Sequence, residues 1–250
     1  MEKDYNTLSN SPCEWEKTIR TASLALTGKG GRGVGIYLFD SLSSITPEQL
    51  SQALAAMPEW RREKALRFKH EQGKKECAFS YLLLCQALKE TYGIDQQPSF
   101  IYGEHGKPAL ASFPGKPASP SSPSSLSPLS SPSSSSLPHF NLSHCKQAIA
   151  CVVSDHPVGI DVECLGRFSE SLARHVLNAD EYQQVITSPN PDLLFTRFWT
   201  QKEAIVKLTG RGIDDDLPNL LLKYSHVTLR TEEHLDKGYV LTVATIPYHE

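Results

Sequence analysis

The chain reads VGIDVE over residues 158–163. In it, Ile160 and Val162 alternate with Asp161 and Glu163, which is the period of a half-buried β-strand with both carboxylates on one face. Side chains on one face of a strand stand roughly 6.5–7 Å apart, so the two anions repel unless water or a cation lies between them. A hard cation such as Mg²⁺ suits carboxylate oxygens and fills its remaining positions with water and substrate phosphate. The stretch therefore indicates either a magnesium site for a phosphate ester or a solvated acidic strand face.

A second stretch, FWTQKEAIVK over residues 198–207, adds a third carboxylate. A helix over residues 200–209 places Glu203 and Lys207 one turn apart on the same face, and Gly210 ends it. Taken alone, such a pair is an ordinary surface interaction, worth roughly 0.2–0.5 kcal/mol. Together with the two acids of the strand, Glu203 offers a group that binds metal or accepts a proton. Lys207 offers an ammonium that neutralises a leaving phosphate.

These two stretches resemble motifs of the 4'-phosphopantetheinyl transferases, specifically the larger, single-chain, pseudodimeric branch of the surfactin-synthetase-activating type. The resemblance extends upstream to GKP at 106–108 and FNLSH at 140–144, and it covers roughly residues 66–213 with one interruption. The four motifs occur in the family's order, which is far more specific than one short match. The resemblance implies an α+β fold of two similar halves, which are related by a pseudo-twofold axis and hold coenzyme A between them.

The family's reaction transfers the 4'-phosphopantetheine arm of coenzyme A to a serine of an apo acyl or peptidyl carrier protein and releases adenosine 3',5'-bisphosphate. By resemblance, we expect this chain to be such an enzyme, with Mg²⁺ as cofactor and with coenzyme A and the carrier as partners. The alternative is a catalytically silent relative that only binds coenzyme A or a carrier. The intact charged residues of the two stretches favour the enzyme, because a pure binding protein does not need all of them. Fatty-acid, polyketide and peptide synthesis all remain open as pathways.

The resemblance also implies a role for each charged residue. Asp161 and Glu163 correspond to Mg²⁺ ligands, and Glu203 to a third ligand or to the base that takes the serine proton. Lys207 corresponds to the group that stabilises or protonates the departing phosphate, and Lys202 to a further phosphate contact. Metal and cations are expected to dominate this chemistry, because a pyrophosphate must be neutralised before an alcohol attacks it.

Three residues of the upstream motifs are implied in the binding of coenzyme A. His144 corresponds to a histidine that holds a phosphate of coenzyme A, and Ser143 belongs to the same binding motif. Lys107 corresponds to a lysine on the nucleotide side. The chain departs from the family pattern at Cys145-Lys146, where a small residue and a glycine are usual. The backbone contacts of that loop are therefore not carried over.

A basic run over residues 61–75 corresponds to the family's region for the 3'-phosphate of coenzyme A. Arg61, Lys64 and Lys75 are the expected contacts, although an amphipathic helix with a solvated basic face would show the same pattern. Acidic residues are interspersed with these cations. A nucleic-acid surface would show a stripe of one sign, so no nucleic-acid partner is expected.

Composition argues against several other classes. The 250 residues have a formal net charge of −3, so binding of an anionic ligand must rest on local cations. No apolar run approaches the roughly 20 residues that span a bilayer, and the N-terminus does not begin as a secretory signal. We therefore expect a cytoplasmic protein without a membrane partner, and we also expect it to be a monomer. The 6 cysteines form no C-x-x-C pair, which argues against a zinc ribbon. The GKGGRG at 28–33 precedes a predicted strand instead of following one, which argues against a dinucleotide fold.

The remaining patterns divide the chain into three parts. These are an irregular N-terminal extension over residues 1–33, an N-terminal half over 34–155 and a C-terminal half over 156–250. A tract of Ser, Pro and Leu over residues 114–138 interrupts the first half, and its composition predicts disorder. Because the cost of closing a loop grows only slowly with its length, the site should tolerate this insertion.

Local signals predict most of the individual elements. Thr46, Pro47 and Gln49 predict a capped helix start, and a long helix is expected over residues 75–92. Strands are predicted over residues 34–39, 99–102, 107–110, 220–222, 226–229 and 239–244. Residues 148–153 and 158–163 are expected to pair as the two arms of a hairpin.

Overall fold

The acidic strand lies at the centre of the molecule. In the computed structural model, which describes residues 20–24, 33–103, 105–111, 137–212 and 216–247, this strand is β7 (Val158–Cys164). Ile160 and Val162 enter a core between two sheets, as the alternation predicts. Asp161 and Glu163 therefore project from the opposite face of the strand.

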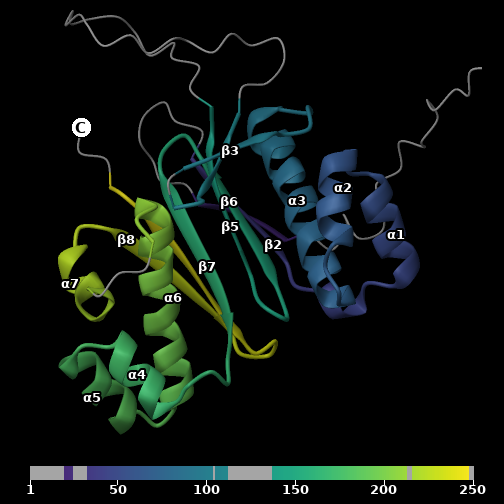
Figure 1. Cartoon of the computed structure of the whole chain (residues 1–250). Helices are drawn as coiled ribbons and strands as arrows, with labels where there is room; N and C mark the ends of the chain where they lie inside the picture. The colour runs from purple at the N-terminus through teal and green to yellow at the C-terminus, as the bar shows by residue number, and fades with distance from the viewer. Residues whose placement is uncertain (1–19, 25–32, 104, 112–136, 213–215, 248–250) are drawn as a thin grey trace, which may run out of the picture.

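β7 is the edge of a three-stranded antiparallel sheet with the order β7-β9-β8. Its partners are β9 (Tyr239–Thr245) and β8 (Thr228–His234). The long helix α6 (Pro191–Thr209) lies along the outer face of this sheet (Figure 1). Shorter elements complete an apolar core around α6: α4 (Glu170–Val176), α5 (Ala179–Thr187), the 3₁₀ turn η3 (Leu217–Asn219) and α7 (Leu220–Lys223).

The second sheet has four antiparallel strands in the order β1-β2-β6-β5. They are β1 (Arg20–Leu24), β2 (Val34–Phe39), β6 (Ile149–Ser154) and β5 (His139–His144). Three helices and a 3₁₀ turn cover its outer face: η2 (Leu42–Ser44), α1 (Pro47–Ala55), α2 (Glu59–Leu66) and α3 (Glu71–Tyr92). A separate hairpin consists of β3 (Phe100–Tyr102) and β4 (Pro108–Leu110).

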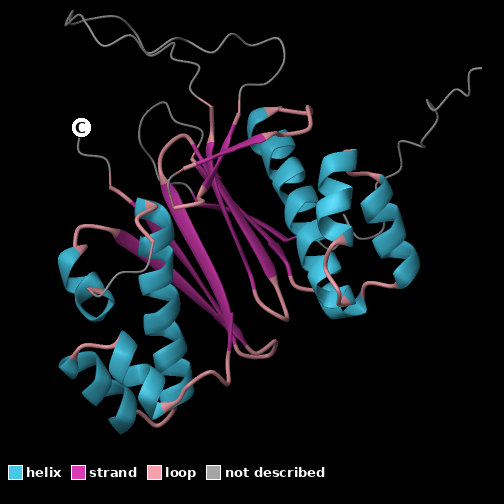
Figure 2. Ribbon diagram, viewed as in Figure 1, coloured by secondary structure: helices cyan, strands magenta, loops and turns pink. Residues whose placement is uncertain are grey.

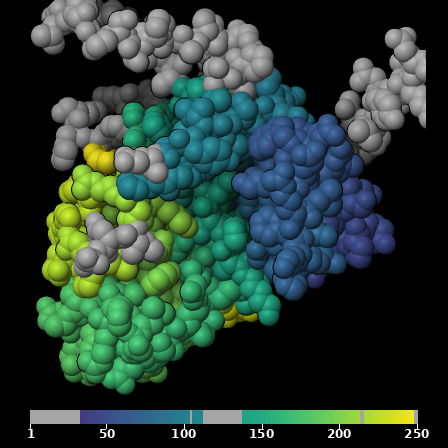
Figure 3. Space-filling model, in the orientation of Figure 1, coloured from purple at the N-terminus to yellow at the C-terminus, as the bar shows by residue number. Residues whose placement is uncertain are grey.

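The elements form four layers, with helices outside and two antiparallel sheets between them (Figure 2). β6 illustrates the arrangement, because it is buried on both faces. Its Cys151 and Val153 pack against the helices, while Ala150 and Val152 pack against the other sheet. The space-filling view shows the two helical sides as blue and green lobes, with teal strands between them (Figure 3).

Side chains of β5 connect the two sheets. The backbone N–H of Ile160 donates to Asn141 Oδ1 at 3.1 Å, and the N–H of Val162 donates to Ser143 Oγ at 3.2 Å. Side-chain oxygens thus replace the carbonyls that a backbone ladder would supply, and the N–H groups of the β7 edge are still satisfied. This contact brings the FNLSH motif beside the acidic strand.

α6 packs directly on β7 at Gly159. A Cβ atom at this position would lie 2.0 Å from the carbonyl oxygen of Ala204 and 2.6 Å from the backbone nitrogen of Leu208. Only a residue without a side chain permits this approach. Because Gly159, Asp161 and Glu163 alternate along the strand, the same close contact brings the two carboxylates against α6.

Several predicted elements are confirmed. The strand over residues 34–39 is β2, the strand over 239–244 lies within β9, and the helix over 75–92 lies within α3. Thr46 caps α1 in a complete capping box with Gln49. The fold is mixed, with antiparallel sheets and helices on their outer faces.

Other predictions are wrong. Residues 148–153 and 158–163 do not form a hairpin, because both edges of β6 are already paired, with β2 and β5. Residues 220–222 lie in helix α7, and the strand predicted at 226–229 begins at Thr228 and continues to His234. Part of the extension predicted to be irregular is the strand β1.

Two further expectations concern the Ser/Pro tract and membrane-spanning helices. Most of the Ser/Pro tract predicted over residues 114–138 lies outside the described residues, since residues 112–136 are not among them. Within the described ranges, no helix is long and apolar enough to cross a membrane.

We expect Gly159→Ala to destabilise the protein by about 2–3 kcal/mol, because the new methyl group would overlap the backbone of α6. Urea unfolding followed by circular dichroism measures this change. The matched control is Gly103→Ala, whose Cβ would meet its nearest atom, the carbonyl oxygen of Lys107, at 3.7 Å. Equal unfolding midpoints for the two variants would contradict the direct packing of α6 on β7.

Candidate functional site

The site lies where β7, α6 and the end of β5 meet. Lys207 Nζ lies 2.6 Å from Asp161 Oδ1 and donates to Ser143 Oγ at 2.8 Å. The Ser143 hydroxyl donates to the same carboxylate oxygen at 2.9 Å. Ser143 therefore makes three hydrogen bonds, one to each of Asp161, Lys207 and the Val162 N–H. The sequence predicts that Asp161 and Lys207 belong to one cluster, and the structure brings them into direct contact.

The second oxygen of Asp161 has a different environment. Asp161 is 3% exposed, yet Oδ2 is buried without a hydrogen-bond partner. A buried carboxylate oxygen without a partner is costly and calls for an explanation, such as a bound ion. Asp161 Oδ2 is thus a donor atom that a hard cation would satisfy.

Glu203 faces the same cluster from α6. Burial raises the pKa of its carboxyl above the ordinary value, the charge of Asp161 raises it further, and Lys207 opposes the shift. Glu163 adds to the increase. The three carboxylates thus lie close together. Such crowding makes a carboxylate easier to protonate or favours the binding of a cation.

Arg167 is a site residue that the sequence interpretation missed. Its Nη1 lies 2.7 Å from Glu163 Oε1, and its guanidinium carbon lies 5.6 Å from the ring centroid of Trp199 on α6. Arg167 follows β7 in a loop, where no periodic pattern indicates the direction of a side chain. The one signal that the sequence offers is the positive charge of Arg167, four residues after Glu163.

The carboxylates do not converge as ligands of one ion in this conformation. Among the described residues, no group of three His, Cys, Asp or Glu side chains is arranged to hold a metal. Lys207 and Arg167 instead compensate the negative charge, at Asp161 and Glu163 respectively. The donor set nevertheless fits a hard cation, because it consists of carboxylate oxygens and includes the unpaired Asp161 Oδ2.

Two residues of the upstream motifs contact other elements, α3 and α6. His144 ends β5 with 51% of its side chain exposed, and its Nδ1 lies 3.7 Å from Glu76 Oε2 on α3. Lys107 donates to the carbonyl oxygens of Lys207 and Leu208, the latter at 3.2 Å, and so caps the C-terminal end of α6. Burial lowers the pKa of the Lys107 ammonium.

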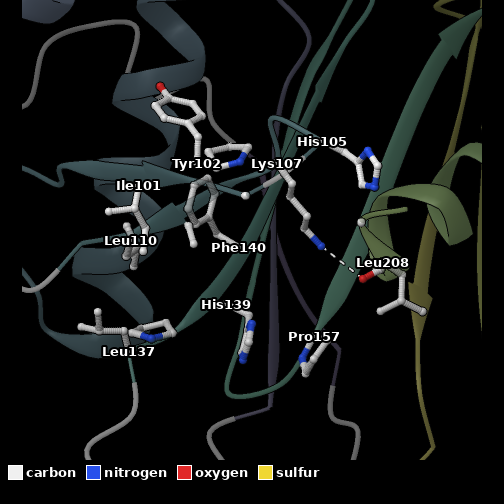
Figure 4. Close-up of a pocket in the computed structure, with 15 residues that line it drawn as sticks. Ile101, Tyr102, His105, Lys107, Leu110, Leu137, His139, Phe140, Pro157 and Leu208 are labelled. Atoms are coloured by element: carbon white, nitrogen blue, oxygen red, sulfur yellow. Dashed lines mark hydrogen bonds between the residues drawn. The ribbon is translucent and has the colours of Figure 1, made fainter. Parts of the chain in front are cut away.

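A cavity of about 560 Å³ lies beside Lys107 (Figure 4). The β3–β4 hairpin, the start of β5 and the end of α6 form its walls, and Tyr102, His139 and Phe140 are among its lining residues. Figure 4 shows the Lys107 side chain extending toward Leu208 across this space. The acidic cluster does not line this cavity.

The structure buries Lys202, the predicted further phosphate contact, in the core around α6. Lys202 is 1% exposed and its Nζ lies 2.8 Å from Glu181 Oε2 on α5. The same ammonium donates to the carbonyl oxygens of Leu217 and Pro218, at 3.0 and 2.7 Å. Lys202 and Glu203 are neighbours in the helix and therefore point in different directions, one into the core and one into the cluster.

The three basic residues predicted to bind a 3'-phosphate lie on α2 and α3. Arg61 donates to the carbonyl oxygen of Cys77 at 3.1 Å and lies over the ring of Tyr81. Lys75 is buried and pairs with Glu71 at 2.7 Å. Lys64 is exposed on α2. Their contact with a phosphate stays a prediction.

We expect Lys202→Met to destabilise the protein by roughly 3–5 kcal/mol, because it leaves the buried Glu181 carboxylate without its partner. The double variant with Glu181→Gln should recover part of this loss. Chemical unfolding measures both changes. Lys223→Met removes an exposed pair with Asp216 and should change stability by less than about 1 kcal/mol. A Lys202→Met protein that is as stable as the Lys223→Met protein would contradict the structural role.

Comparison with known proteins agrees with this geometry. A family model described as the 4'-phosphopantetheinyl transferase superfamily matches residues 157–244, the segment from β7 to β9 that includes the acidic cluster. The chain is 25% identical over 215 residues to a 4'-phosphopantetheinyl transferase of Bacillus subtilis, covering 83% of this chain and 84% of that protein. It is 25% identical over 182 residues to 4'-phosphopantetheinyl transferase Sfp of Bacillus subtilis (strain 168), covering 72% and 70%.

A shorter match is more similar in sequence. The chain is 35% identical over 122 residues to 4'-phosphopantetheinyl transferase psf-1 of Bacillus pumilus, which is 43% of this chain and about half, 52%, of that relative. The family model and the relatives agree with one another and with the positions of the motifs. Residues 157–244 match the 4'-phosphopantetheinyl transferase superfamily, and the chain is similar to relatives that are named as 4'-phosphopantetheinyl transferases, Sfp among them.

Proposed function

We propose that this protein transfers the 4'-phosphopantetheine arm of coenzyme A to a serine of an apo acyl or peptidyl carrier protein and releases adenosine 3',5'-bisphosphate. The observation that supports this most directly is the contact of Asp161 with Lys207 and Ser143, beside the buried carboxyl of Glu203. The relatives that match the chain are named 4'-phosphopantetheinyl transferases.

In this proposal, Asp161, Glu163 and Glu203 hold one Mg²⁺. When bound, the ion supplies positive charge that neutralises the diphosphate of coenzyme A and makes its phosphorus more electrophilic. The unpaired Asp161 Oδ2 and the crowding of three carboxylates support this assignment. Glu203 has a second role open to it, because a raised pKa also suits a base that takes the serine proton.

The cations of the chain act on the phosphates. Lys207 neutralises the charge that develops on the leaving phosphate, and its position at the acidic cluster supports this role. His144 has an exposed ring that can donate to a phosphate, and Ser143 and Lys107 complete the proposed contacts on the coenzyme A side. Arg61, Lys64 and Lys75 remain the predicted contacts of the 3'-phosphate.

We also propose that the chain consists of two similar halves, residues 34–155 and 156–250, with coenzyme A between them. In support, each half places one long helix on one antiparallel sheet: α3 lies on the sheet of β5 and β6, and α6 on the sheet of β7 and β9. The chain passes from one sheet to the other between β6 and β7, which also supports a boundary after residue 155. A pseudo-twofold relation, a monomeric state and a cytoplasmic location stay predictions.

We expect Asp161→Asn and Glu203→Gln each to reduce transfer at least 10²-fold, because each removes a charge from the proposed metal and base cluster. The assay mixes the protein, Mg²⁺, coenzyme A and an apo carrier protein, and mass spectrometry detects carriers with one added phosphopantetheine. Asp180→Asn, an acid on α5, is the control and should keep wild-type activity.

Two outcomes of this assay would count against the proposal. Full turnover by Asp161→Asn with Mg²⁺ as the sole divalent cation would contradict the metal assignment. A wild-type protein that binds coenzyme A but modifies none of several apo carriers would favour the catalytically silent alternative.

The raised pKa of Glu203 predicts a pH-dependent stability without divalent cations. A carboxyl whose pKa is higher in the folded state stabilises the fold below its unfolded-state pKa, and this stabilisation is lost as pH rises through the folded-state pKa. At pH 7.5, Glu203→Gln should therefore unfold at a higher urea concentration than wild type, and this advantage should shrink toward pH 4.5. Added Mg²⁺ should stabilise wild type more than the variant. An identical response of both proteins to Mg²⁺ would contradict Glu203 as part of the ion site.

A further inference from the structure

Two thiols lie at the junction of the two sheets, and the proposed reaction uses neither of them. Cys145 follows the end of β5 directly after His144, and Cys164 is the last residue of β7, directly after Glu163. Both are free cysteines. Cys145 is 8% exposed and belongs to the core between the sheets, while Cys164 packs against that core and is only partly buried.

The two thiols lie beside the same side-chain oxygen. Cys145 Sγ donates to Gln147 Oε1 at 3.9 Å, and Cys164 Sγ donates to the same atom at a shorter distance. The tight turn that returns the chain from β5 to β6, in which the Cys145 N–H donates to the Ala148 carbonyl at 2.8 Å, holds Gln147 in this position.

The other described cysteines lie on the helical side of the four-stranded sheet, in the core around α3. Cys77 and Cys85 lie eight residues apart on α3, so about 12 Å of helix separates them, whereas a disulfide needs Cα atoms within roughly 7 Å. Cys151 lies in the middle of β6 and is fully buried. Cys145 also stands where the family pattern has a small residue, so the pair belongs to this chain's own departure from that pattern.

We propose that Cys145 and Cys164 form an oxidation site that a hydroperoxide closes to an intramolecular disulfide, and that this bond weakens the binding of coenzyme A at the adjoining site. The second part rests on the proposed function. The first part rests on the shared contact of the two thiols with Gln147 Oε1, with the partly buried Cys164 as the point of attack and the buried Cys145 as its resolving partner.

The chemistry balances with hydrogen peroxide as the oxidant. The Cys164 sulfur attacks one peroxide oxygen, the O–O bond breaks, and the sulfur becomes a sulfenic acid while one water leaves with the thiol proton. The Cys145 sulfur then attacks the Cys164 sulfur, the S–O bond breaks, and a second water leaves with the second thiol proton. Two thiols are oxidised by two electrons in total, and one peroxide is reduced to two waters.

The bond would move residues that the site needs. The sulfur atoms of a disulfide lie about 2.05 Å apart, closer than two sulfur atoms that are not bonded to each other. Closing the bond therefore draws the end of β5 toward the end of β7. His144 and Glu163 are the immediate neighbours of the two cysteines and shift with them, and small displacements of positioning groups reduce affinity and rate.

The test treats the full chain with one equivalent of hydrogen peroxide, alkylates it without reduction, and maps its peptides by mass spectrometry. We expect a Cys145–Cys164 disulfide in wild type and in the control Cys85→Ser, and none in Cys145→Ser or Cys164→Ser. Calorimetric titration with coenzyme A in the presence of Mg²⁺ should show at least fivefold weaker binding after oxidation. A thiol reductant should restore the affinity, and Cys145→Ser should show no loss.

Each result decides one part of the proposal. Thiols that oxidise to separate sulfinic acids, or that pair with other cysteines, would overturn the oxidation site. A Cys145–Cys164 disulfide that leaves affinity within twofold would overturn its effect on binding. A reduced protein that binds no coenzyme A would instead contradict the proposed function, and the peptide map would still decide whether the disulfide forms.

Discussion

The hydroxyl of Ser143 is the interaction on which the arrangement of the site depends. It accepts from the Val162 N–H and from Lys207, and it donates to Asp161, so one atom connects β5, β7 and α6. Three elements from distant parts of the chain therefore meet at a single oxygen. Because these groups are partly or fully buried, each bond must be satisfied within the protein. The same contact that connects the two sheets also orients the charged groups.

The charges around this oxygen do not balance one another. Asp161, Glu163 and Glu203 concentrate negative charge, which Lys207 and Arg167 compensate only in part. The raised pKa of Glu203 and the unpaired Asp161 Oδ2 both reflect this uncompensated negative charge. A cluster whose charges are not balanced by its own chain is prepared to receive a cation or a proton, which is the common feature of acid–base and metal sites.

The close packing of α6 on β7 has a second consequence for neighbouring residues of the helix. Glu203 points toward the strand, whereas Lys202 points into the core and pairs with Glu181. The motif around them contains both a residue of the acidic cluster and a stabilising ion pair, and spacing along the sequence does not distinguish the two. The FNLSH motif of β5 also contains residues with a structural role, because Asn141 and Ser143 connect the two sheets.

Local patterns predicted the elements whose signals lie within a few residues. The Thr46 capping box, the end of α3 at Gly93 and the strand β2 are examples, because caps and alternation act over one or two turns of chain. The hairpin predicted for residues 148–163 failed because periodicity shows that a segment is a strand but not which strand pairs with it. Here β6 already has partners on both edges.

The sequence by itself determined that Asp161 and Glu163 share one face of a strand and that Glu203 and Lys207 share one face of a helix. Those relations follow from the repeats of the backbone. Only the tertiary structure decided that Lys202 is buried, that Arg167 pairs with Glu163, and that both sheets meet at Ser143. The physical reason is that burial and long-range pairing depend on which surfaces pack together. That choice is made by the whole chain, and no stretch of a few residues contains it.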